Sequence, residues 1–239
     1  MQKIFKQQAA PPWSYLAALG AFIAMFLSII IGATIAGTLL GDAPIALVVG
    51  WSAGMALTIG YVVFSRRHDP QSIEALRLGE TSARLPLIAL FAFGVAVLFD
   101  LVSWVVVGQQ TLANAELLTL SASDVSIMGW LVALLFLVLL QPVGEEMVLR
   151  GMMYPAFSAA LGGRLGFFAV SAFYAMFHFL AYTPAVDDQT VFLWYGLGLP
   201  FLQGMTLTAI RAHTGSTRAA IVAHAMFGAF ALLKVITFA

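Results

Sequence analysis

The chain contains no cysteine and few charged side chains, and both absences limit what it can be. Without cysteine, its 239 residues can form no disulfide, no thiolate metal site and no cysteine nucleophile. Charged residues make up 9% of the chain, against roughly 25% in ordinary soluble domains. The formal net charge is zero, so the composition gives no reason to expect nucleic acid as a partner. With 62% hydrophobic residues and a mean hydropathy of +0.97, the chain is expected to be an integral membrane protein.

Apolar runs long enough to cross a bilayer fill most of the chain. A helix needs about 20 residues to cross roughly 30 Å of hydrocarbon. Runs of this length lie at residues 14–40, 44–64, 85–107, 127–149, 165–182, 191–212 and 217–238. We therefore predict an all-α polytopic membrane helix bundle, a single transmembrane domain over residues 1–239, with about seven or eight transmembrane helices. The eighth would be a short interfacial helix between Gly108 and Ser126. The fourth run contains Pro142 yet continues to about Leu161, so we expect a kink or a re-entrant end there.

Basic residues gather on alternate connections between these runs, which gives the bundle an orientation. They are Lys3, Lys6, Arg66, Arg67, Arg77, Arg84, Arg150, Arg164, Arg211 and Arg218. The opposite connections carry acidic residues and no basic ones, and Lys234 is the exception on that side. The positive-inside rule then predicts a cytoplasmic N-terminus, in a plasma membrane of the bacterial type. Asp100, inside the third run, is expected near the outer end of its helix or bonded to a neighbouring helix.

Residues 50–54, Gly-Trp-Ser-Ala-Gly, fit two different patterns. The spacing of Gly50 and Gly54 is typical of a small-residue face that lets two membrane helices approach closely. The same residues match the Gly-x-Ser-x-Gly nucleophile signature, but that motif functions at a strand-to-helix turn. Because Ser52 lies in the middle of a predicted helix, we interpret the segment as packing.

The most unusual charges lie at the end of the fourth run, in Glu145, Glu146 and Arg150. An ionisable side chain at bilayer depth costs at least roughly 2.5–3.5 kcal/mol, so such a cluster indicates a functional site. Glu146 and Arg150 are four residues apart and are therefore expected to form an ion pair on one helix face. Glu145 is rotated by about 100° from Glu146, and we expect it to face a cavity.

Two histidines lie within other apolar runs, His178 in the fifth and His224 in the seventh. A buried carboxylate such as Glu145 can act as a general base on water. Two imidazoles opposite it could orient that water and donate hydrogen bonds to a developing oxyanion. Together, these side chains would suffice to hydrolyse an amide inside a membrane.

The order of these residues resembles a known family. The chain has Glu-Glu-x-x-x-Arg, then an aromatic-x-x-x-His helix, and then a helix that carries His224 after a Thr-Gly-Ser turn. This pattern resembles the CPBP (CAAX protease and bacteriocin-processing) intramembrane proteases. The resemblance covers about residues 125–235, the expected catalytic core, and leaves residues 1–124 as N-terminal spans and a cytoplasmic loop. It implies an intramembrane endopeptidase that acts on a membrane-associated or lipidated peptide or protein, with the lipid bilayer as its other partner.

The resemblance also implies a role for each residue. Glu145 falls on the catalytic glutamate of the family, and Glu146 and Arg150 fall on its supporting pair. His178 and His224 fall on its two essential histidines. In the eukaryotic members of the family, the glutamate and the first histidine activate water, and the second histidine and an asparagine stabilise the oxyanion.

Two positions depart from the family pattern. Tyr174 replaces the usual phenylalanine four residues before the first histidine, and Gly228 replaces the usual asparagine four residues after the second. Losing an oxyanion donor can cost about 2.7–4 kcal/mol. We hypothesise that the hydroxyl of Tyr174 partly compensates, and we expect Gly228→Asn to raise turnover.

Three alternatives remain open from the sequence. Gly228 favours a catalytically inactive family member that acts as a membrane binding or immunity protein. The buried charges and the broken fourth run are also compatible with a transporter, although no inverted repeat of spans is visible. No cofactor is expected and the His-Glu-x-x-His zinc motif is absent. Glu145, His178 and His224 could nevertheless bind a divalent metal such as zinc.

Overall fold

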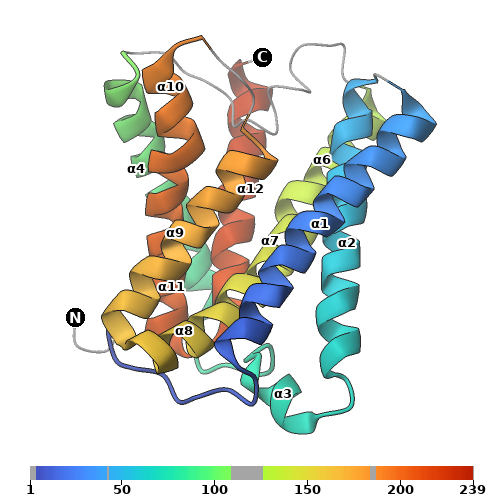
Figure 1. Ribbon diagram of the computed structural model, residues 1–239. Helices are drawn as coiled ribbons and strands as arrows, with labels where there is room; N and C mark the ends of the chain where they lie inside the picture. The colour runs from blue at the N-terminus through green and yellow to red at the C-terminus, as the bar shows by residue number, and fades with distance from the viewer. Residues whose placement is uncertain (1–3, 42, 109–125, 184–186, 239) are drawn as a thin grey trace.

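The computed structural model describes residues 4–41, 43–108, 126–183 and 187–238, and the regular structure within them is entirely helical (Figure 1). The predicted all-α membrane bundle is confirmed. In chain order the elements, with η marking π-helical segments, are α1 Tyr15–Leu40, α2 Pro44–Arg66, α3 Pro70–Ala75, α4 Leu85–Val106, α6 Ile127–Leu134, η1 Leu135–Leu140, α7 Gln141–Glu146, η2 Met147–Met153, α8 Tyr154–Leu161, α9 Gly163–Ala181, α10 Gln189–Leu193, η3 Trp194–Gly198, α11 Leu199–Thr214 and α12 Thr217–Phe238.

Six of the described helices are long and apolar enough to cross a membrane. They cover six of the seven predicted runs, and one of them is a helix of 35 residues, Ile127–Leu161. The remaining run is helical from Gln189 to Thr214 through α10, η3 and α11, but it is not among the six. Glycines and polar side chains such as Gln203 lower its hydropathy. The predicted interfacial helix falls on residues 109–125, which lie outside the described residues.

Helices α1 and α2 pack so closely that their contact requires glycine. A Cβ atom on Gly50 would lie 2.6 Å from Cα of Ala33, and one on Gly54 would lie 2.7 Å from Cα of Ile29. The hydroxyl of Ser52 is buried and donates to a backbone carbonyl one turn earlier in α2, at 2.8 Å. The segment is therefore a packing contact, as predicted.

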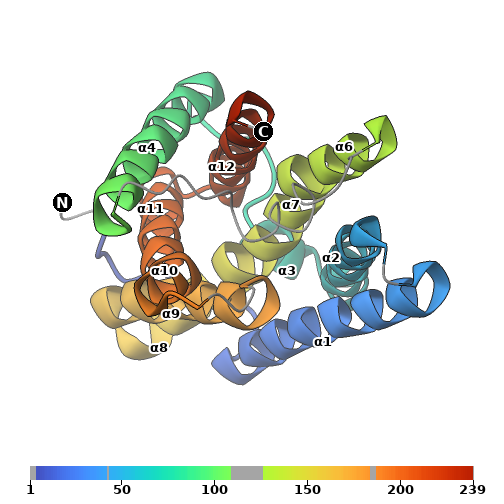
Figure 2. The ribbon, with the colours of Figure 1, turned by 90° about the horizontal axis from the view of Figure 1, so that it is seen from above.

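The long helix Ile127–Leu161 passes between the α1–α2 pair and α12, as Figure 2 shows. It continues through Pro142 without a break, so the predicted re-entrant end is absent from this described segment. A chain reversal at Gly162, whose φ of +84° favours glycine, then leads into α9. The close approach of α8 and α9 is also built on glycine, since a Cβ atom on Gly166 would lie 2.6 Å from Cα of Ser158.

Each of the three π-helical segments ends two residues before a proline: Pro142 after η1, Pro155 after η2 and Pro200 after η3. Proline has no N–H, and its ring clashes with the carbonyl of the residue four positions earlier. In all three places the preceding residue donates its N–H to the carbonyl five positions earlier, as Gln141 does to Phe136. The wider turn lets the helix accommodate the proline with its backbone still hydrogen-bonded.

An ion pair between α4 and α12 explains the one basic residue on the acidic side of the bundle. Asp100 and Lys234 form a short salt bridge in which the lysine side chain is 9% exposed and the carboxylate 28% exposed. Lys234 is thus neutralised within the bundle, which removes its conflict with the positive-inside pattern. Asp100 is bonded to a neighbouring helix, one of the two arrangements expected from the sequence.

We predict that Asp100→Asn lowers stability by up to about 3 kcal/mol, because removing one partner leaves the Lys234 ammonium unpaired. The double variant Asp100→Leu/Lys234→Met should recover most of this loss. Thermal unfolding in detergent micelles measures both effects. Equal losses in the single and double variants would show that the pair adds nothing to the stability of the α4–α12 contact.

Candidate active site

Three fully buried ionisable side chains lie on the long helix where α7 meets η2. Glu145, Glu146 and Arg150 each have a relative exposure of 0%. Charges buried in this way are tolerated when they are paired and hydrogen-bonded. Their partners come from three other helices, α9, α11 and α12, and these contacts define the site.

Glu146 is the centre of one set of contacts. Its Oε1 atom accepts hydrogen bonds from Nη1 of Arg150 at 2.8 Å and from Nδ1 of His224 at 3.0 Å. Nη2 of Arg150 donates to the carbonyl oxygen of Gly204 at 2.8 Å, and its guanidinium lies 4.7 Å from the ring centroid of Tyr174. The ion pair predicted from the spacing of Glu146 and Arg150 is present, and it joins the long helix to α9, α11 and α12.

Glu145 is the centre of the other set. Its Oε2 atom lies 3.1 Å from Nε2 of His178 on α9. Ligand atoms of Glu145, His178 and His224 all lie within 4.8 Å of one another. A water molecule at the centre of this triangle would be within hydrogen-bonding distance of all three.

Both ring nitrogens of His224 have hydrogen-bond partners. Because Nδ1 faces the carboxylate of Glu146, it carries the proton and donates. Nε2 lies 3.3 Å from the hydroxyl of Tyr174 and forms a hydrogen bond with it. Tyr174 is 1% exposed, and its ring also lies against that of His178, with 4.3 Å between centroids. The hydroxyl of Tyr174 therefore lies among the polar side chains of the site, with His224 as a partner.

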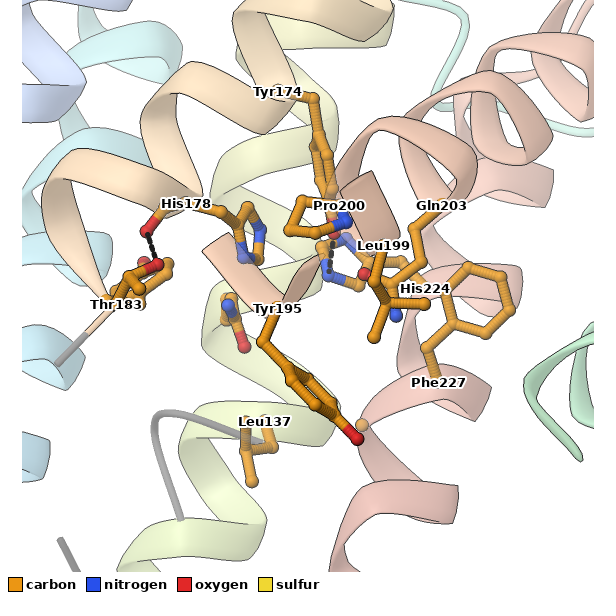
Figure 3. A pocket seen from close by; sticks show the side chains of 13 residues that line it. Leu137, Tyr174, His178, Thr183, Tyr195, Leu199, Pro200, Gln203, His224 and Phe227 are labelled. Carbon is orange, nitrogen blue, oxygen red and sulfur yellow. Dashed lines mark hydrogen bonds between the residues drawn. The ribbon is translucent and has the colours of Figure 1, made fainter. Parts of the chain in front are cut away.

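A small cavity opens beside the two histidines (Figure 3). Its volume of about 40 Å³ is sufficient for at least one water molecule. The residues that line it are Leu137, Gln141, Tyr174, His178, Tyr182, Thr183, Tyr195, Leu199, Pro200, Gln203, His224, Phe227 and Gly228. Glu145 is not among them, but its partner His178 is.

Two glutamines of this cavity, Gln141 and Gln203, were not predicted from the sequence. Gln141 precedes Glu145 by four residues on the same helix, so the spacing alone could have indicated a shared face. Gln203 lies on α11, within the apolar run at residues 191–212. No local pattern marks Gln203, because only the tertiary contact between α11 and α12 brings it to His224.

A larger cavity of about 540 Å³ lies between α4 and α11, and it shares no residue with the first. Its walls are mostly apolar, with Arg84 and His213 as its ionisable members. It contains no carboxylate, so it cannot provide the acid–base pair that hydrolysis requires. The smaller cavity is therefore the candidate active site.

Gly228 is fixed by packing. A Cβ atom at this position would lie 2.8 Å from the carbonyl carbon of Leu137 and closer still to its oxygen. Helix α12 thus rests directly on the backbone of η1. An asparagine side chain could enter this contact only if the two helices moved apart. The expected rise in turnover for Gly228→Asn stays a prediction.

Residues 127–230 match the model of a protein family described as type II CAAX prenyl endopeptidase Rce1-like. The predicted CPBP resemblance is confirmed. The matched residues contain both glutamates, Arg150 and both histidines, and they leave helices α1–α4 outside. Comparison with curated proteins and with solved structures gave no match. The six membrane-length helices and this match indicate an integral membrane protein in which residues 127–230 are similar to CAAX endopeptidases.

We predict that Gly228→Ala destabilises the protein by about 1–3 kcal/mol, the usual cost of overpacking. Gly94→Ala in α4 is the matched control, because a Cβ atom there meets nothing within 4 Å. Thermal unfolding of the two variants in the same detergent provides the comparison. A melting temperature for Gly228→Ala equal to that of Gly94→Ala would contradict the close contact with Leu137.

Proposed function

We propose that the protein is an intramembrane endopeptidase that uses water activated by Glu145 and His178 to hydrolyse a peptide bond of a membrane-associated or lipidated substrate. One observation carries this proposal. Glu145, His178 and His224 come from three different helices, and their ligand atoms converge to within 4.8 Å beside a cavity that has room for water. All three residues lie inside the region that matches the CAAX endopeptidase family.

The proposed reaction begins with a water molecule held between Glu145 and His178. Its oxygen attacks the carbonyl carbon of the scissile amide, and its proton passes to the Glu145–His178 pair. The tetrahedral intermediate carries the negative charge on the former carbonyl oxygen. The pair then returns the proton to the amide nitrogen, the C–N bond breaks, and a carboxylic acid and an amine leave.

Glu146 and Arg150 position this machinery. Their carboxylate–guanidinium pair holds His224 through its Nδ1 atom, and it holds α11 through the carbonyl of Gly204. Neither side chain lines the cavity. Their effect on the reaction is therefore to fix where His224 and α11 lie.

The donor set of Glu145, His178 and His224 is chemically suitable for a divalent metal. However, the carboxylate of Glu145 and Nε2 of His178 lie at 3.1 Å, a hydrogen-bonding distance. Both nitrogens of His224 also have partners, in Glu146 and Tyr174. These contacts favour a shared proton and a water molecule over a metal ion.

A second candidate is a catalytically inactive membrane binding or immunity protein. Gly228 favours it, because the asparagine donor of the family is missing and the packing against Leu137 leaves no space for its return. Turnover distinguishes the two functions. Because the matched family is described as a CAAX prenyl endopeptidase, the first substrate to test is an internally quenched peptide with a farnesylated CAAX C-terminus. A panel of transmembrane peptides is tested next.

We predict that Glu145→Gln lowers kcat by about 10²–10⁴-fold, the usual contribution of a general base, while the protein still folds. The substitution keeps the shape of the side chain and removes its basicity. Glu146→Gln should lose both activity and several degrees of melting temperature, because Arg150 would lose its buried counter-charge. Cleavage rates with quenched peptides, together with thermal unfolding, separate the two effects. Wild-type turnover in Glu145→Gln would rule out the proposed base.

We also predict that chelators leave cleavage unchanged and that no stoichiometric zinc accompanies the purified protein. Cleavage is measured with and without 1,10-phenanthroline, and metal content is measured by mass spectrometry. If one zinc per chain were found and then lost in His178→Ala, the two histidines and Glu145 would be metal ligands.

A further inference from the structure

The proposed reaction requires hydrogen-bond donors for the oxyanion, and the expected donors are engaged or absent. Nδ1 of His224 donates to Glu146, and its Nε2 is hydrogen-bonded to the hydroxyl of Tyr174. The tyrosine hydroxyl is therefore directed at His224. Gly228 has no side chain, and its contact with Leu137 leaves no space for one. A donor must come from another element of the cavity wall.

Gln203 is the carboxamide on the His224 side of the cavity. It lines the cavity together with His224 and Gly228, and in Figure 3 its side chain extends toward His224 beside Leu199. The other carboxamide, that of Gln141, lies one helical turn from Glu145 and so belongs to the side that holds the water.

The backbone that carries Gln203 is held by the same contacts that hold His224. The carbonyl of the next residue, Gly204, accepts hydrogen bonds from Arg150 at 2.8 Å and from Thr208 at 2.7 Å. Arg150 is bonded in turn to the oxygen of Glu146 that holds His224. Gln203 and His224 are therefore in fixed register, although they lie on different helices.

The side chain of Gln203 also has space to adjust to a substrate. It is half-buried, and it lines a second small cavity of about 20 Å³ on its other side. Tyr195, Leu199 and Phe227 line both cavities as well. The amide can therefore turn toward a bound carbonyl oxygen without displacing the packed core.

We propose that Gln203 is a catalytic residue whose side-chain N–H donates to the oxyanion, in place of the asparagine that CPBP proteases have at the position of Gly228. This role rests on the proposed protease function. It makes the missing asparagine compatible with an active enzyme. The donor has moved from α12, where Gly228 is needed for packing, to the facing helix α11.

The test compares Gln203→Met with wild type, because methionine keeps the length of the side chain and removes the donor. With the quenched farnesylated CAAX peptide, kcat should fall by about 10²–10³-fold, the usual cost of one oxyanion donor. KM should stay within about twofold and the melting temperature should not change, since a transition-state contact alone is lost. Gln203→Asn, a shorter amide, should retain part of the activity. Thr206→Val, on the same helix but lining the larger cavity, is the matched control and should cleave at the wild-type rate.

A peptide with a thioamide at the scissile bond gives a readout that a packing role would not change. Sulfur is a weak hydrogen-bond acceptor, so wild type should prefer the oxygen substrate strongly, and Gln203→Met should lose much of that preference.

Three outcomes would overturn the role of Gln203. An unchanged kcat in Gln203→Met, or a rise in KM alone, would reject it while wild-type cleavage and an inactive Glu145→Gln left the protease function intact. An unaltered thioamide preference would also reject it. A wild-type protein that cleaves neither the CAAX peptide nor the transmembrane panel would overturn the protease function, and the role of Gln203 with it.

Discussion

The carboxylate of Glu146 is the contact on which the site depends. One of its oxygens accepts hydrogen bonds from both Arg150 and His224, and Arg150 reaches on to the backbone of α11. In an apolar bundle these charges stabilise one another only in this mutual arrangement. The long helix, α11 and α12 are thereby fixed in one register, which sets the positions of His224 and Gln203. Glu145 can then keep its contact with His178, because Glu146 compensates the charge of Arg150.

The sequence predicted those parts of the structure that follow from local spacing or from the cost of burying charge. Apolar runs gave six of the membrane-length helices, and the four-residue spacing gave the Glu146–Arg150 pair. It could not predict that Glu145 would lie off the cavity wall or that Gln203 would lie on it. These positions depend on how α9, α11 and α12 cross the long helix, which involves contacts between residues far apart in the chain. Likewise, Lys234 contradicted the charge pattern until its contact with Asp100 was known.

Proline and glycine shape the surroundings of this network in different ways. Pro142 and Pro200 each follow a π turn, and residues beside both turns line the cavity. Such turns are frequent at functional sites because they displace side chains from the regular helical spacing. Glycines act instead through their lack of a side chain, which lets two helices approach closely. A Cβ atom on Gly204 would lie 3.0 Å from the carbonyl oxygen of Ser171, so the lack of a side chain lets α11 approach α9 closely. The carbonyl oxygen of Gly204 then accepts a hydrogen bond from the guanidinium of Arg150.

Gly228 and Gln203 together show how packing and chemistry are divided between two facing helices. At Gly228, the contact of α12 with η1 excludes any side chain, so no donor can be placed there without moving the helix that carries His224. A donor at Gln203 on α11 meets no such restriction, because this side chain is only half-buried. The same Arg150 contact that balances the buried charge also holds α11 against the site. An oxyanion donor on α11 would therefore be as well oriented as one on α12, and its side chain would not have to enter the contact with Leu137.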